Sequence, residues 1–283
     1  MAKPFVNPFV SGQFLELRVD ALVSDGRGLG RHDGVVVLVE DALPGQLVRA
    51  RVAAVRKSLA EAALVEVLER SPDEQEPPCP HAGRCGGCSW QSLAYGRQLA
   101  WKERIVHDAL ERVGKVACPP MLPILPSPSE WGYRNKMEFA FGVSGDGGKA
   151  LGLRERGSRN IVEVTGCLLQ TPLTMRVLEA VRMLSNGAFH DLDGRFLVVR
   201  EPNAGGCFVE LIVGAGGSLE AGERFAEALR AETPEVTGFA LSERLAPSDV
   251  AYGERALYAD GRLEERIGDV RLQMGHNAFF QVN

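Results

Sequence analysis

The chain has 283 residues, of which 45% are apolar and 24% charged, ordinary values for a globular protein large enough to bury a substantial core. No apolar run approaches the ~18 residues needed to span a bilayer. The N-terminus also lacks the long apolar segment of a secretion signal. The composition therefore argues against a membrane or secreted protein, and we expect a cytoplasmic location.

The net charge of −5 is unevenly distributed along the chain. Residues 1–160 hold 21 Lys and Arg against 19 Asp and Glu, whereas residues 161–283 hold 11 against 18. The acidic total argues against a strongly basic nucleic-acid binder. Any RNA-facing surface should lie in the first part, where local basic clusters can form.

Short strands are predicted over residues 14–69. Residues 14–19 alternate apolar and polar side chains, and turn signals stand at residues 26–31 and at Pro44-Gly45. Strands at this spacing favour a small OB-like β-barrel, a fold that often binds nucleic acid. The expected strands cover residues 14–19, 35–39, 47–52 and 62–68.

The remainder of the chain mixes helices and strands. An acidic, proline-rich linker at residues 71–78 precedes a cysteine cluster, and helical periodicity follows over residues 92–113. Thr171-Pro172 begins a helix that should end near residue 186, and residues 218–232 form an amphipathic helix. Further strands are expected at residues 137–141, 196–200, 208–213, 257–258, 262–267 and 270–274.

Three of the six cysteines, Cys79, Cys85 and Cys88, have the spacing C-x5-C-x2-C. Thiols this close in a glycine-rich loop can converge on one inorganic centre, which needs a fourth ligand. His81, Cys118, Cys167 and Cys207 are the candidates. An iron–sulfur cluster is the favoured interpretation, and a structural zinc site is the alternative.

The sequence resembles SAM-dependent RNA methyltransferases that form 5-methyluridine. Residues 11–70 resemble the TRAM module, and the Cys79–Cys88 block with Trp90-Gln91 resembles the family's cluster loop. Three further segments match in order: the Y-R-N-K signature at residues 133–136, the region of Cys167, and the F-x-Q-V-N segment at residues 279–283.

This resemblance implies specific site residues. A 4Fe–4S cluster would be held by Cys79, Cys85, Cys88 and Cys167, Gln281 would contact S-adenosyl-L-methionine, and Phe279 would lie near the flipped base. RNA would also contact Tyr133, Arg134 and Lys136, because a ring and two cations next to each other suit stacking and phosphate binding. An ordinary solvated strand is the alternative for these three residues.

The expected fold class is α+β, with an N-terminal OB-like barrel (TRAM), a central mixed α/β domain with the iron–sulfur loop, and no Rossmann-like methyltransferase domain. The expected parts are a barrel at 1–72, the cluster loop at 73–91, a helix at 92–118 that would pack on the methyltransferase domain, a central domain at 119–278, and the start of the absent SAM-binding domain at 279–283.

The expected function is methylation of uridine C5 in RNA, with ribosomal RNA (23S) favoured over transfer RNA and no obligate protein partner. That reaction needs a thiolate nucleophile at C6 of uracil, a base that removes the C5 proton, and an extruded base. We identify no catalytic residue in this chain and expect it to be inactive by itself. The alternative is a stand-alone RNA-binding or redox-sensing iron–sulfur module without methyl transfer.

Overall fold

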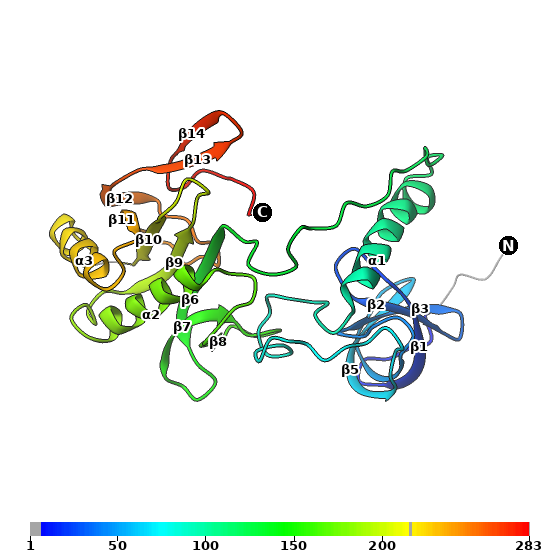
Figure 1. Ribbon diagram of the computed structural model, residues 1–283. Coiled ribbons are helices and arrows are strands. Elements are labelled where there is room, and N and C mark those ends of the chain that lie inside the picture. The colour runs from blue at the N-terminus through cyan, green and yellow to red at the C-terminus, as the bar shows by residue number, and fades with distance from the viewer. Residues whose placement is uncertain (1–6, 215–216, 283) are drawn as a thin grey trace. The chain divides into compact units, whose positions relative to one another are not determined.

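The computed structural model describes residues 7–214 and 217–282, and these fall into two compact units (Figure 1). The first unit contains the chain through residue 82 and residues 88–128. The second contains residues 83–87 and the chain from residue 129 onward. The cysteine cluster is therefore divided between the units, because its short central segment belongs to the second.

Five strands of the first unit close into a barrel in the order β1-β2-β3-β5-β4. Side chains alternate along β1, so that Leu15, Leu17 and Val19 point into the barrel core. The strands β3 and β5 run parallel and the other pairs antiparallel. The strands are β1 (Phe14–Leu22), β2 (Gly28–His32), β3 (Val35–Glu40), β4 (Leu47–Val55) and β5 (Leu59–Glu69).

A helix follows the barrel in the first unit. It consists of α1 (Tyr95–Asp108), continued by a π-helical turn, η1 (Ala109–Val113). The buried side chain of α1 is that of Trp101, which packs on barrel residues Leu22 and Leu43. No helix in the described ranges is long and apolar enough to cross a membrane.

The second unit is built on a seven-stranded sheet with the order β12-β11-β10-β9-β6-β7-β8. The neighbours β10 and β11 run parallel and are connected by α3, whereas the other paired strands run antiparallel. A hairpin of β13 and β14 follows. The strands are β6 (Lys136–Val143), β7 (Lys149–Arg154), β8 (Ile161–Val162), β9 (Gly194–Arg200), β10 (Cys207–Val213), β11 (Val236–Glu243), β12 (Arg255–Asp260), β13 (Leu263–Ile267) and β14 (Val270–Met274).

Two helices, α2 (Pro172–Asn186) and α3 (Leu219–Glu232), pack on the same face of this sheet and form its main core (Figure 1). Thr171 caps α2 by accepting a hydrogen bond from the N–H of Thr174, and Ser218 caps α3 in the same way through Ala221. Both helices therefore begin where the sequence provides a hydroxyl side chain.

The opposite face of the sheet carries a C-terminal segment, residues 275–282. Arg200 of β9 donates to the carbonyl of Ala278 at 2.7 Å, and the N–H of Asn135 donates to that of Val282 at 3.0 Å. Through Val282, the last described residues therefore pack on the second unit. A segment without regular secondary structure has no periodicity from which such packing can be predicted.

Candidate nucleic-acid interface and cysteine loop

The cysteine loop is anchored in the first unit by the residues that follow it. The indole N–H of Trp90 donates to the carbonyl of Gly26 at 2.9 Å. The side-chain oxygen of Gln91 accepts a hydrogen bond from the N–H of Cys79 at 3.3 Å. Cys79 and Cys88 belong to this unit. The pair Trp90-Gln91 therefore fixes both ends of the loop next to the barrel.

The middle of the loop, residues 83–87, belongs to the second unit. Cys85 pairs with Glu155 as an antiparallel bridge, and the N–H of Gly87 donates to the sulfur of Cys85 at 3.4 Å. Hydrogen bonds from backbone amides to cysteine sulfur are among the contacts that tune cysteine-ligated metal centres.

Cys167 lies in the second unit, in a turn that ends at the N-terminus of α2. It is half-buried against the main core, and its carbonyl accepts from the N–H of Gln170 at 3.0 Å. Among the residues that the structure describes, no group of three or more His, Cys, Asp or Glu is placed to hold a metal ion. The four expected ligands are divided two and two between the units.

The Y-R-N-K segment joins two other segments that the sequence had singled out. The N–H of Arg134 donates to the carbonyl of Leu169 at 3.0 Å, near Cys167, while Asn135 binds Val282 in the C-terminal segment. Lys136 forms an ion pair with Glu138 two residues further along β6. Part of the positive charge expected at this segment is therefore neutralised within the protein.

The C-terminal segment presents its aromatic and amide side chains to solvent. Phe279 is 85% exposed and Gln281 is exposed, although the backbone around them is fixed by Arg200 and Asn135. A ring held on an anchored backbone can stack on an unpaired base at a low entropic cost. The Asn135–Val282 hydrogen bond thus brings the expected RNA-contact segments, 133–136 and 279–282, together.

A buried polar group beneath this segment was missed by sequence reasoning. Glu210 of β10 is 2% exposed, and its Oε1 lies 3.9 Å from the ring of His276. Burial lowers the pKa of nearby Arg200 from its ordinary value, while the charges of Glu210 and Glu138 oppose that shift. The signal in the sequence was one glutamate in an otherwise apolar strand, residues 207–213.

Cys207 is fully buried, and desolvation raises the pKa of its thiol to about 12, so it does not supply a thiolate at neutral pH.

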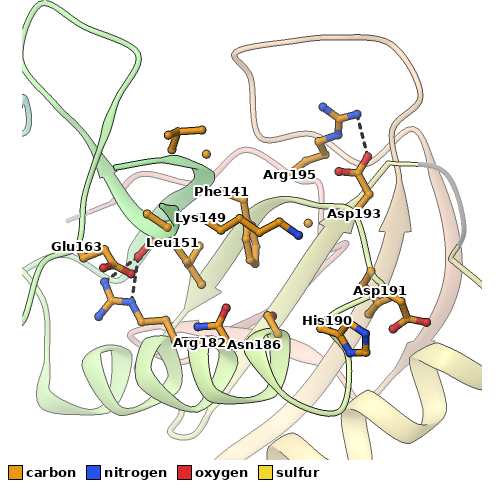
Figure 2. A pocket seen from close by; sticks show the side chains of 16 residues that line it. Phe141, Lys149, Leu151, Glu163, Arg182, Asn186, His190, Asp191, Asp193 and Arg195 are labelled. Carbon is orange, nitrogen blue, oxygen red and sulfur yellow. Dashed lines mark hydrogen bonds and ion pairs between the residues drawn. The ribbon is translucent and has the colours of Figure 1, made fainter. Parts of the chain in front are cut away.

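A cavity of about 410 Å³ lies next to α2, with Lys149 extending into it (Figure 2). Its other cations are engaged: Arg182 binds the carbonyl of Leu151, and Arg195 pairs with Asp193.

Comparison with known proteins supports the interpretation of the barrel. Residues 8–65 match the family model of the TRAM domain. The chain is 45% identical over 97% of its length to a protein of Nitratidesulfovibrio vulgaris named as an uncharacterized RNA methyltransferase, and 33% identical over 96% to one of Thermosynechococcus vestitus. The chain spans 61% and 62% of the lengths of these two relatives.

A solved structure has a similar fold. It is the tRNA (uracil-54, C5)-methyltransferase of Pyrococcus abyssi in complex with S-adenosyl-L-homocysteine, at 23% identity and a TM-score of 0.68. The similarity covers 94% of this chain and 61% of that enzyme. At this level of sequence identity, the similarity shows that the two proteins share a fold and no more than that.

This likeness corrects the expected fold class. The absence of a Rossmann-like methyltransferase domain was inferred because no catalytic residue of the resembled family was identified in the sequence. Instead, nearly the whole chain aligns with a solved methyltransferase. The expectation that this chain is inactive depended on the same inference and is not supported.

Proposed function

We propose that this chain acts in the SAM-dependent methylation of uridine C5 in RNA and provides the RNA-binding part of that activity. The observation that carries the proposal is the 45% identity over 97% of the chain to a protein named as an RNA methyltransferase. The TRAM match at residues 8–65 and the methyltransferase-like fold support it.

The proposed RNA contacts are Tyr133, Arg134, Lys136 and Phe279. Their support is the Asn135–Val282 hydrogen bond, which keeps the two segments that carry them adjacent. Tyr133 and Phe279 offer rings for stacking on unpaired bases, and Arg134 offers a planar guanidinium for phosphate. Gln281, exposed on the same segment, is proposed to contact S-adenosyl-L-methionine.

Deletion of the encoding gene tests the reaction. We expect the loss of 5-methyluridine from one RNA class, measured by mass spectrometry of nuclease-digested, separately purified ribosomal and transfer RNA. Ribosomal RNA is the proposed substrate, so loss from transfer RNA alone would reassign it. Unchanged 5-methyluridine in both classes would refute the proposed reaction, and RNA binding without any loss would favour a stand-alone RNA-binding module.

We further propose that Cys79, Cys85, Cys88 and Cys167 hold a 4Fe–4S cluster. The support is the chemistry of the donor set: four thiols, with the Gly87 N–H directed at the sulfur of Cys85. Methyl transfer from a sulfonium to carbon is redox-neutral, so the cluster would stabilise the loop rather than transfer electrons. Through their bonds to the cluster, the four cysteines would then keep residues 79–91 in a defined conformation.

Metal analysis of anaerobically purified protein tests this assignment. We expect iron and acid-labile sulfide with a brown colour, both absent from Cys85→Ser and both retained in Cys118→Ser, which removes a cysteine outside the proposed set. Stoichiometric zinc without iron in the wild-type protein would contradict the cluster and favour a zinc site.

A further inference from the structure

A small antiparallel pairing joins the cysteine loop to the end of β7. Cys85 is bridged to Glu155, the N–H of Gly86 donates to the carbonyl of Arg154 at 3.0 Å, and the N–H of Arg156 donates to that of Arg84 at 2.8 Å. This pattern fixes the register of the pair: Arg84 lies opposite Arg156, and Gly86 lies opposite Arg154. Figure 1 shows this part of the loop beside β8, which pairs with β7.

The register places three arginines on one face of the pair. Residues directly opposite each other in an antiparallel pair share a face, as do residues two apart along a strand. Arg84, Arg154 and Arg156 therefore share a face, which we call the arginine face. Cys85 and Glu155 project to the other side.

The nearby acids leave the arginine face positively charged. The Glu155 carboxylate, on the other side, accepts hydrogen bonds from Ser158 and Asn160 at 2.8 and 3.0 Å. Asp249 lies 3.6 Å from Arg154 and also pairs with Arg159. One carboxylate is thus shared between two arginines.

Arg84 is the most available of these cations. It is exposed, and its guanidinium makes no side-chain hydrogen bond within residues 7–214 and 217–282, although its charge acts on the nearby Glu155 carboxylate. An anion can therefore reach Arg84 directly, beside the half-buried Arg154 and Arg156 on the same face. Three arginines on one face are therefore better suited to contact with a polyanion than to contact with water alone.

We infer that the arginine face binds the phosphate backbone of the RNA substrate. The inference rests on the proposed function, which supplies RNA as the polyanion. Guanidinium groups bind phosphate through two parallel hydrogen bonds, and an exposed face with several of them can reach successive phosphates. The cysteine loop then has a second role, because its backbone hydrogen bonds to β7 hold Arg84 opposite Arg156.

Salt-dependent RNA binding tests the arginine face. The probe is a fluorescein-labelled single-stranded RNA of mixed sequence, and anisotropy gives the dissociation constant across a salt series. Removal of one arginine–phosphate ion pair should lower the slope of log K against log salt by about 0.7, which weakens binding roughly fivefold at 0.1 M salt. We expect this change in Arg84→Gln.

Two controls separate a phosphate site from a general charge effect. Arg262→Gln/Arg271→Gln removes two exposed arginines near the β13–β14 hairpin, which forms a sheet separate from the one that contains β8, and should leave the slope unchanged. Arg84→Lys keeps the charge and should keep the slope. Circular dichroism verifies folding. Arg84→Gln breaks no side-chain hydrogen bond within the described ranges, so this variant should fold as the wild type does.

The outcomes distinguish the two proposals. If the wild-type chain binds RNA and Arg84→Gln shows the same slope of log K against log salt as the wild type, the arginine face is refuted, whereas the proposed RNA binding stands. An equal reduction in the hairpin control also refutes it, because net charge would then explain the effect. If the wild-type chain does not bind RNA at all, the proposed RNA-binding function fails together with this inference.

Discussion

The backbone N–H of Asn135 donates to the carbonyl of Val282 at 3.0 Å. This hydrogen bond joins the start of β6 to the end of the described chain. On β9, which pairs with β6, Arg200 holds the carbonyl of Ala278. The C-terminal segment is therefore fixed at two points, and the exposed Phe279 lies between them.

Replacement of Arg200 should loosen this segment. A hydrogen bond from a charged donor contributes about 1.5 kcal/mol, so Arg200→Met should accelerate hydrogen exchange of the Asn135 amide by roughly tenfold. NMR-detected exchange measures this amide directly. Arg195→Met, at the start of the same strand, provides the control because Arg195 pairs with the exposed Asp193. Unchanged Asn135 exchange in Arg200→Met would show that the two anchors act independently.

Trp101 should account for most of the attachment of α1 to the barrel. It is the buried side chain of that helix, where it packs against Leu22, Leu43 and Leu93. Trp101→Ala should lower the free energy of unfolding of the first unit by about 3 kcal/mol, since large buried aromatics typically contribute that much. Urea denaturation followed by circular dichroism gives the value. Val113→Ala, at an 81% exposed position, should change it little.

The local elements were predictable where the sequence carries a local signal. Thr171-Pro172 and Ser218 correctly predicted the starts of α2 and α3, because a hydroxyl N-cap depends on neighbouring residues. The strand β11 was missed. It is buried along most of its length, so it lacks the alternation that identifies a half-buried strand.

The candidate sites were less predictable, because they depend on pairing between distant residues. The bridge between Cys85 and Glu155 spans 70 positions of sequence and leaves no local pattern. The alignment of Arg84 with Arg156 depends on that register. Glu210 was visible as a charge in an apolar strand, but the segment that covers it was visible only in the structure.

Asp260 should make the stability of the second unit depend on pH. Burial alone would raise the pKa of its carboxyl, but hydrogen bonds from Arg230, Tyr258 and the Phe239 N–H outweigh burial and hold that pKa below its ordinary value. A carboxyl with a depressed folded-state pKa contributes stability above its unfolded-state pKa, about 4. That contribution disappears as pH falls through the lower folded-state value.

The Asp260→Asn variant measures this contribution. It should be less stable than wild type at neutral pH, and the difference in free energy of unfolding should shrink as pH falls below about 4. Urea denaturation at several pH values gives both curves. Asp269→Asn, at an exposed position, is the matched control. A wild-type advantage that persisted unchanged at low pH would show that the carboxylate charge is not responsible.

Cys207 should be the slowest thiol to alkylate in the native protein. Its side chain is fully buried, and its pKa of about 12 leaves roughly 10⁻⁵ of the thiols ionised at pH 7. Iodoacetamide should modify the half-exposed Cys118 in the native state but Cys207 only after denaturation, as mass spectrometry of tryptic peptides would show. If Cys207 reacted as fast as Cys118, the thiol would be accessible and ionisable. It would then have to be considered as the nucleophile for C6 of uracil, a role that its burial at the start of a central strand otherwise argues against.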